Sequence, residues 1–255
     1  MLTSFVEACH SMKIDPRLDP FLLGAAFDHE LTFSTSPPTR QGDRDRINHL
    51  VELCRGRRVL HLGCCDHPPL VPDKIREGTW LHGQLTEASA ECLGVDIDRE
   101  AVEFVKRETG FNNIWVADLS VAAPEPVLSG PAWDLLVAGE IVEHLDNPVD
   151  FLSRVHRNLR NYCKEILVTV PNAFSLQNFL GATRHVESIN SDHRYWFTPY
   201  TLAKVLTRSG YRPTAFDHVS HGSITPRGIR SWLRVQILRK YPSLRQTLVM
   251  SATWD

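Results

Sequence analysis

The sequence lacks any apolar run approaching the roughly 20 residues that a helix needs to cross a bilayer, and it contains neither an internal repeat nor a low-complexity tract. Its first residues, MLTSFVEACHSMKIDPRLDP, are interrupted by acidic side chains and hold no apolar core of the signal-peptide kind. These absences disfavour a membrane-spanning protein and a repeat array. We expect a cytoplasmic protein without a membrane span.

The sequence also lacks the paired cysteines of metal-binding and redox motifs. Its six cysteines are scattered: Cys9, Cys54, Cys64, Cys65, Cys92 and Cys163. None forms a C-x-x-C pair, which disfavours a zinc ribbon and a dithiol redox centre. Several lie inside apolar runs, where a free cysteine packs as a small hydrophobic side chain. This pattern is typical of a reduced, intracellular protein.

The sequence also lacks an excess of charge of either sign. Lys and Arg number 28 and Asp and Glu number 30, so the net charge is −2 at pH 7. This balance gives no general case for nucleic acid or an anionic membrane as the partner. With 255 residues and 42% hydrophobic side chains, the chain can bury a sizeable core. We expect a globular protein that acts on a small-molecule substrate.

Short apolar runs alternate with helical patterns along most of the chain. Strands are expected over 58–62, 93–96, 113–117, 133–138, 165–170, 214–218 and 248–253. Helices are expected over 43–54 and 80–91, after Asp98, after Asn147, after Thr198 and in the basic segment 224–241. This order predicts an α/β fold with a doubly wound, mostly parallel seven-stranded sheet, helices on both faces and an antiparallel last strand.

Two regions flank or interrupt this pattern. Residues 1–42 are irregular and rich in proline, so we expect an N-terminal helical cap over 1–55 and the main domain over 56–255. The basic segment is expected as a helical insert. One interpretation makes it a solvated helix whose Trp232, Leu233 and Ile237 pack down onto the protein. The alternative makes its arginines a site for an anionic substrate.

The ends of the first two main strands carry the most information about function. In RRVLHLGCCD (57–66) an apolar run stops at Gly63, and in GVDID (94–98) a second run stops at Asp96. Ligands of doubly wound sheets bind at the carboxyl ends of the strands, and an acid there accepts hydrogen bonds from a ribose diol. Asp118 and Gly139 end the next two parallel strands. These four positions predict a nucleoside site.

Four motifs in this order resemble the class I S-adenosylmethionine-dependent methyltransferases: VLHLGCCD, GVDID, VADLS and LLVAGEIVEHLDNP. The later stretches PNAFSLQNFL and DHRYWFTPYTLAKVLTRSGY are similar to the corresponding parts of that family, and the resemblance covers about residues 57–215. It implies a Rossmann-like methyltransferase domain with S-adenosylmethionine as cofactor. The function implied is transfer of its methyl group to an acceptor.

The resemblance also implies contacts for the donor. Gly63 and Cys64 would pass beside its methionine part, and Asp66 would face its amino group. Asp96, followed by Ile97, would accept from the ribose hydroxyls. The remaining implied positions are Asp118 for the adenine amino group, Leu119 beside the ring, and Gly139, Glu140 and Ile141 on the far side.

The first loop departs from the family pattern. The family has several glycines there, whereas only Gly63 is present here and CCDH follows it. Bound pyrophosphate needs a bare backbone, so the missing glycines disfavour a dinucleotide. A sulfonium donor has no phosphate and tolerates this loop. An NAD-dependent oxidoreductase and a non-catalytic S-adenosylmethionine-binding protein are kept as competing hypotheses.

Glu140, Glu143 and His144 are spaced at i, i+3 and i+4, so they can converge, and His193 in DHRYWF is a fourth candidate. Small-RNA 2′-O-methyltransferases and ubiquinone-pathway O-methyltransferases have a similar E-x-x-E-H. The four side chains would bind a divalent metal in one interpretation, and orient the cofactor loop or the substrate in the other. For a hydroxyl acceptor, His144 is the first candidate general base and His193 the second.

The favoured function is therefore methyl transfer from S-adenosylmethionine to a small-molecule hydroxyl, for example on a glycan or a secondary-metabolite precursor. The metal interpretation leads to a different alternative, an RNA 2′-O-methyltransferase. The net charge gives that alternative no support.

Overall fold

The computed structural model describes residues 11–35, 44–222 and 228–254. Its strands are β1 (Met12–Lys13), β2 (Arg58–Leu62), β3 (Glu91–Asp96), β4 (Ile114–Val116), β5 (Leu135–Gly139), β6 (Glu165–Pro171), β7 (Tyr211–Val219) and β8 (Thr247–Trp254). Its α-helices are α1 (Asp19–Leu23), α2 (Arg46–Cys54), α3 (Val71–Arg76), α4 (Leu81–Ala88), α5 (Arg99–Thr109), α6 (Glu125–Leu128), α7 (Pro148–Leu159), α8 (Leu176–Ala182), α9 (Pro199–Arg208) and α10 (Ile229–Lys240).

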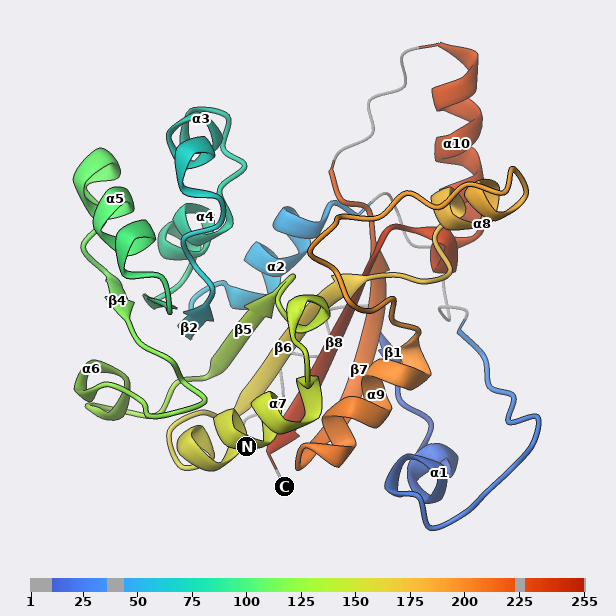
Figure 1. Ribbon diagram of the computed structural model, residues 1–255, viewed down its shortest axis with the longest axis horizontal. Coiled ribbons are helices and arrows are strands. Elements are labelled where there is room, and N and C mark those ends of the chain that lie inside the picture. Colours follow the sequence, from blue (N-terminus) through green and yellow to red (C-terminus); the bar gives the residue numbers. More distant parts are fainter. Residues whose placement is uncertain (1–10, 36–43, 223–227, 255) are drawn as a thin grey trace.

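The strands form one sheet in the order β1-β7-β8-β6-β5-β2-β3-β4 (Figure 1). The five strands from β6 to β4 run parallel, and β8 lies antiparallel to both of its neighbours, β6 and β7. The expected α/β fold class, with its antiparallel last strand, is confirmed. The sheet has one more strand than expected, because β1 pairs with β7. Two residues are too few to show a strand period in the sequence.

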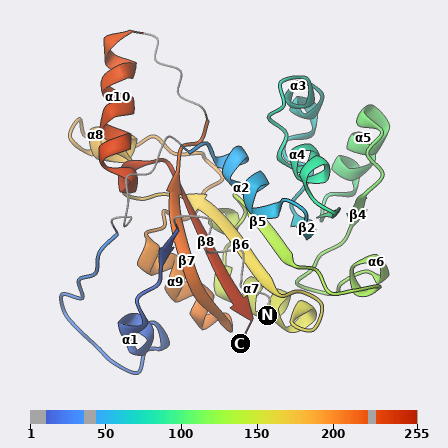
Figure 2. The same cartoon turned by 180° about the vertical axis from the view of Figure 1, so that it is seen from behind.

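Helices cover both faces of the sheet, as the alternation of side chains along the strands requires. Val59 and Leu135 belong to the core cluster under α2 and α4, whereas their neighbours Leu60 and Leu136 belong to the larger cluster under α7, α9 and α1. Figure 2 shows the sheet from behind, with these layers on either side. The central strands are therefore buried on both faces, which explains their continuous apolar runs.

Local signals in the sequence fix several helix ends. The Asp98 carboxylate accepts from the backbone N–H of Ala101 at 3.0 Å and caps α5, which ends at Gly110 in the left-handed conformation. Asn147 caps α7, and Thr198 forms a capping box on α9. These caps confirm the expected helix starts.

The segment after β2 is rich in proline. It contains a 3-10 turn, Pro68–Leu70, followed by the six-residue helix α3. Pro68, Pro69 and Pro72 all lie in first turns, where the missing N–H breaks no intrahelical bond. These prolines therefore start short helices.

The segment before β2 packs closely on the rest of the chain. α1 contacts α9, and α2 contacts α4 across one face of the sheet. The division into a cap over 1–55 and a domain over 56–255 remains a prediction, and β1 from the first part is paired into the common sheet. No helix among the described residues is long and apolar enough to cross a membrane.

Packing of the basic C-terminal helix differs from one expectation. In one of the two interpretations of this segment, Trp232, Leu233 and Ile237 of α10 pack down onto the protein, but they are 51%, 49% and 37% exposed. Only Val235 and Leu238 of α10 are buried. The expectation of packing is wrong because α10 contacts the body mainly through the 3-10 turn Pro242–Leu244, which leaves most of its surface free.

Candidate functional site

The carboxyl ends of the parallel strands bring the predicted residues to one edge of the sheet. Leu62 of β2 is in register with Val95 of β3 and with Ala138 of β5. The next residues along each strand, Gly63, Asp96 and Gly139, are therefore neighbours. Asp118 follows β4 at the same edge, since Asp96 is in register with Val116. The predicted convergence at the strand ends is what the structure shows.

Gly63 is required by a close approach. Its φ is +68°, and a Cβ atom built there would lie 2.7 Å from Cδ1 of Ile141. Its N–H donates to the Val95 carbonyl at 2.8 Å, which continues the β3 pairing by one residue. The chain after β2 thus turns sharply against the residue that follows Glu140. This turn leaves the backbone of Gly63 bare on the edge where a ligand would lie.

Asp96 is held in place by two backbone donors. Its Oδ2 accepts from the N–H of Cys65 at 3.0 Å, and its Oδ1 accepts from the N–H of Asp98 at 3.1 Å. Each carboxylate oxygen keeps a further lone pair for a ligand. Ile97, the next residue, is 70% exposed and offers apolar surface beside it.

The rest of the first loop is tied down internally. Lys74 Nζ lies 2.5 Å from Oδ2 of Asp66. Burial alone would raise the pKa of the Asp66 carboxyl, but the bonds from Lys74 and from the His67 N–H outweigh it and hold that pKa below its usual value. Cys64 and Cys65 are buried, with their Sγ atoms 4.0 Å apart. Their contact and burial raise the pKa of the Cys64 thiol, so it stays protonated and packs.

At the end of β4, Asp118 forms a local turn. Its Oδ1 accepts from the N–H and the Oγ of Ser120 at 2.9 and 2.7 Å. Within the described ranges its Oδ2 has no hydrogen-bond partner. The side chain of Leu119 lies in the main core, and its carbonyl accepts from Asn158 Nδ2 at 2.9 Å. The cofactor roles of both residues remain predictions.

One candidate residue was missed in the sequence. Arg46 begins α2, and its Nη1 lies 3.8 Å from the point where a Cβ on Gly139 would stand. Its buried Nε has no hydrogen-bond partner among the described residues. Its charge also acts on Asp66 and Glu143. An unpaired guanidinium at this edge would bind an anionic group of a ligand. Only the tertiary packing of α2 reveals it.

The turn after β5 holds two acids of unusual character. Glu140 has a φ of +57°, and its buried Oε1 lacks a hydrogen-bond partner within the described chain. The side chain of Glu143 is fully buried, and neither of its oxygens has a hydrogen-bond partner there. Burial and the nearby charge of Glu140 raise the pKa of Glu143 to about 8, against the opposing charge of Arg46. A buried, unsatisfied acid of this kind marks a functional site.

The two candidate bases lie together beside Glu143. The rings of His144 and His193 are perpendicular, with centroids 4.6 Å apart, and His193 Nε2 lies 4.0 Å from Oε1 of Glu143. The N–H of Arg194 donates to the Glu143 carbonyl at 2.8 Å and anchors the distant segment. Ligand atoms of Glu143, His144 and His193 all lie within 4.8 Å of one another. Of the four side chains that one interpretation makes metal ligands, Glu140 lies outside this group.

The state of His193 suits proton abstraction. Burial and the neighbouring His144 lower the pKa of the His193 imidazole. The ring is therefore neutral at pH 7, and a neutral imidazole accepts a proton.

Comparison with known proteins identifies the domain type. Residues 78–163 match a family model described as a methyltransferase domain. Among curated proteins, none matches the chain.

Two solved structures have the same fold. One is a chain of the complex between the Haloferax volcanii Trm112 methyltransferase activator and a methyltransferase, with a TM-score of 0.52 and 14% identity over 81% of this chain and 88% of that one. The other is the small RNA methyltransferase HEN1, with a TM-score of 0.52 and 14% identity over 90% of this chain but 27% of that one. At these identities the likeness is one of fold.

Proposed function

Because this chain belongs to the class I S-adenosylmethionine-dependent methyltransferase superfamily, we propose that it methylates a hydroxyl group of a small molecule with a histidine as general base. The observation that carries this proposal is the pair of His144 and His193 on the same sheet edge as Asp96. An alcohol must lose its proton as it is alkylated, and a neutral imidazole is the side chain suited to take it at pH 7.

The residues at this edge fit S-adenosylmethionine. Asp96 would accept from the ribose hydroxyls, and Asp118 from the adenine amino group. The bare backbone of Gly63 would lie against the methionine part. The guanidinium of Arg46, whose buried Nε has no hydrogen-bond partner within the described chain, would pair with the methionine carboxylate. When bound, the cofactor supplies an electrophilic methyl group on a sulfonium.

The chain's own residues align the acceptor and move one proton. The acceptor oxygen bonds to the methyl carbon as the carbon–sulfur bond breaks and its electron pair stays on sulfur. The hydroxyl proton passes to the imidazole of His193 or His144. Correct placement of oxygen, carbon and sulfur lowers the barrier by several kcal/mol, and the general base contributes about 10²–10⁴-fold.

A methyl-transfer assay tests this proposal. The protein is incubated with labelled S-adenosylmethionine and separate low-mass and RNA fractions of a cell extract, and labelled products are sized. We expect label in low-mass, hydroxyl-derived ethers. His193→Gln or His144→Gln should lower kcat by about 10²-fold or more while the Kd for the cofactor changes little. His67→Gln, on the exposed loop, is the matched control. Label confined to RNA, or full kcat in both variants, would contradict the proposal.

A second candidate function is metal-dependent methyl transfer. Its acceptor would be RNA, by analogy with the small RNA methyltransferase HEN1, which has the same fold. The cluster of Glu143, His144 and His193 favours it, because two imidazoles and a buried carboxylate are a suitable ligand set for a divalent cation. Bound metal would also explain the unsatisfied Glu143 oxygens.

Calorimetric titration with Co²⁺ separates the two candidates. Metal dependence requires binding that Glu143→Gln abolishes and that Glu103→Gln, an exposed control on α5, leaves intact. Activity should then be lost with a chelator and restored by Mg²⁺, Mn²⁺ or Co²⁺. Absence of Co²⁺ binding together with full activity in chelator would remove this candidate. The methyltransferase domain match sets the NAD-dependent and non-catalytic hypotheses aside.

A further inference from the structure

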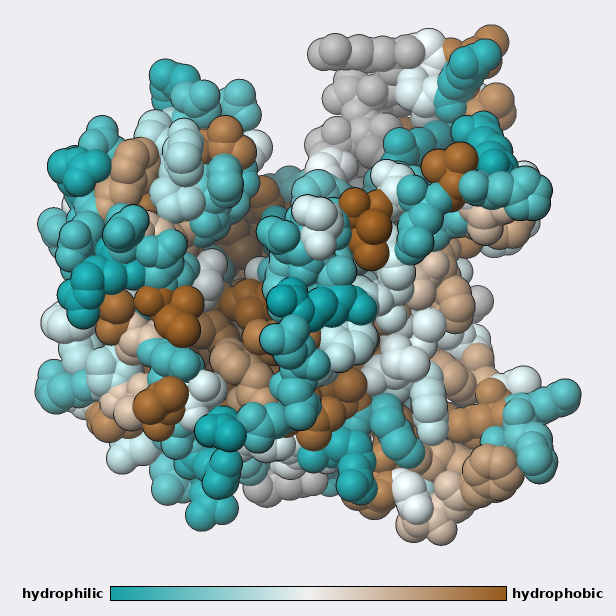
Figure 3. Space-filling view, in the orientation of Figure 1, coloured by the Kyte–Doolittle hydropathy of each residue, from teal (hydrophilic) through white to brown (hydrophobic). Residues whose placement is uncertain are grey.

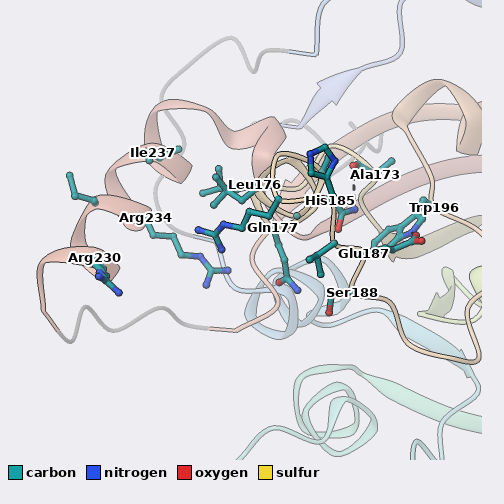
Figure 4. A pocket seen from close by; sticks show the side chains of 17 residues that line it. Ala173, Leu176, Gln177, His185, Glu187, Ser188, Trp196, Arg230, Arg234 and Ile237 are labelled. Atoms are coloured by element: carbon teal, nitrogen blue, oxygen red, sulfur yellow. Dashed lines mark hydrogen bonds between the residues drawn. The ribbon is translucent and has the colours of Figure 1, made fainter.

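A groove of about 1150 Å³ lies between α8, the chain that follows it, and α10 (Figure 4). The two helices are some fifty residues apart in the sequence, yet both ribbon views place them side by side beyond the carboxyl end of β6 (Figures 1 and 2). The groove is slightly larger than the usual range of about 300–1,000 Å³ for small-molecule sites. Gly63, Asp96 and Asp118 do not line it.

The wall on the α8 side depends on a close contact between the backbone of Gly181 and that of Val186. The chain after α8 folds back so that the N–H of Val186 donates to the Gly181 carbonyl at 3.0 Å. A Cβ atom on Gly181 would lie 2.6 Å from the Val186 carbonyl oxygen. Only glycine allows this contact, so the shape of the wall is specified by the sequence.

Apolar side chains line both walls. Leu176, Leu180 and Val186 come from the α8 side, and Leu233 and Ile237, one turn apart, come from one face of α10. Leu180, Val186 and Leu233 are each at least 40% exposed. Figure 3 shows brown, hydrophobic residues among teal ones at the surface of this part of the molecule. Exposed apolar surface inside a groove is typical of a ligand site.

The same groove carries unpaired positive charge. Arg184, Arg230 and Arg234 line it, and none forms an ion pair within the residues that the structure describes. In Figure 4, Arg234 extends from α10 toward the opposite wall. The one acid of the lining, Glu187, accepts from Trp196 Nε1 at 3.3 Å. The charge complementarity therefore favours an anion with an apolar body.

One end of the groove adjoins the candidate bases. Trp196 lines the groove and follows His193 by three residues, so their Cα atoms lie at most about 11 Å apart. The segment is anchored beside the site, because the Tyr195 hydroxyl donates to the Asp146 carbonyl at 2.9 Å. The Trp196 side of the groove is therefore connected to His193 by three residues of the chain.

We propose that this groove binds the methyl acceptor, and that the acceptor is an anionic amphipath. It has an apolar chain or ring system, a phosphate or carboxylate, and the hydroxyl that is methylated. The apolar body lies between Leu180 and Leu233, and the anion pairs with Arg230 and Arg234. This inference rests on the proposed function for its statement that the ligand is the acceptor.

Binding of probe amphipaths, measured by calorimetry without cofactor and below their micelle concentrations, tests the inference. Dodecyl phosphate is compared with laurate, with neutral dodecyl maltoside and with cationic dodecyltrimethylammonium. We expect at least one anionic probe to bind about tenfold or more tighter than the neutral and cationic probes. The stronger of the two anions identifies the anionic group of the acceptor. Equal binding of all four probes, or none by any, would overturn the proposal.

Matched variants locate the binding. Arg230→Gln combined with Arg234→Gln should weaken the anionic probe about tenfold or more. Arg239→Gln, an exposed position of α10 outside the groove, should leave it unchanged. An equal loss of affinity for the anionic probe in the double variant and in Arg239→Gln would contradict the assignment of the binding site to this groove. So would unchanged affinity in both proteins. If the double variant loses binding only to phosphatidylglycerol vesicles, while monomeric probes never bind, α10 is a membrane-docking surface and the proposal fails.

Cofactor binding distinguishes failure of this inference from failure of the proposed function. The double variant should keep the wild-type Kd for S-adenosylmethionine, since none of the residues assigned to the cofactor lines the groove. If wild-type protein binds the cofactor but no anionic probe, this inference alone fails. If it binds the anionic probe but not the cofactor, the proposed function fails and the groove remains an anion-amphipath site.

Discussion

The backbone N–H of Cys65 donates a 3.0 Å hydrogen bond to Oδ2 of Asp96, and so joins the loop after β2 to the end of β3. The loop and the acid are 31 residues apart in the chain. Their bond makes the Gly63 turn and the Asp96 carboxylate one rigid unit. Disturbing the turn should therefore change ligand binding as well as stability.

Gly63→Ala should lower both the free energy of unfolding and cofactor affinity. Its φ of +68° costs an alanine about 1–2 kcal/mol, and its Cβ would displace Ile141 from the edge. Gly56→Ala is a matched control, because Gly56 has the same φ of +68° with nothing within 4 Å of its Cβ position. Urea unfolding should show losses in both variants, and calorimetry should show weaker S-adenosylmethionine binding only for Gly63→Ala. Equal affinities would contradict the proposed role of the turn.

Arg46→Gln should discriminate between parts of the cofactor. A charge-assisted hydrogen bond contributes about 1.5–3 kcal/mol, so affinity for S-adenosylhomocysteine should fall about tenfold or more. Affinity for adenosine, which lacks the methionine carboxylate, should stay unchanged. Arg55→Gln, an exposed residue after α2, is the control. An equal loss for both ligands would show that Arg46 acts on the fold.

Acidification should destabilise the protein through its buried histidines. Burial lowers the pKa of both His82 and His218 to about 4. It also lowers the pKa of His61 well below its usual value, with the charge of His82 as a second cause. Between pH 6.5 and pH 4 the unfolded chain binds protons that the folded protein does not, so stability is complete above pH 6.5 and declines below it.

At pH 5 the loss should be on the order of 1–2 kcal/mol for each such histidine. Urea unfolding between pH 7 and pH 5 measures this slope. His82→Asn should reduce the slope of the free energy of unfolding against pH, whatever its effect on stability at pH 7. His67→Gln, at an exposed position, should leave this slope unchanged. An unchanged slope in His82→Asn would show that His82 has the same pKa in the folded and the unfolded state, which would contradict the account.

Local patterns predicted the fold well. Apolar runs that end at a glycine, an acid or a proline placed the five parallel strands. Side-chain caps such as Asp98 and Asn147 placed helix starts. Convergence of Gly63, Asp96 and Asp118 followed from parallel pairing alone. These features depend on near neighbours in the chain, so one sequence contains them.

The features that were missed depend on tertiary packing. Arg46 precedes the first main strand and reaches the edge only because α2 lies across the sheet beside α4. The exposure of Leu233 depends on how few contacts α10 makes with the body. The basic segment 224–241 was expected to be helical, but its sequence could not show which face of the helix is covered.

The most direct measurement is calorimetric titration of the wild-type protein, Asp96→Ala and Glu103→Gln with S-adenosylmethionine. Glu103 is an exposed acid on α5, close in sequence but outside the edge of the sheet. We predict sub-millimolar binding by the wild type and Glu103→Gln, and binding about tenfold or more weaker by Asp96→Ala because the ribose loses its acceptor. Absence of sub-millimolar binding by the wild type, or equal affinity in all three proteins, would contradict the account.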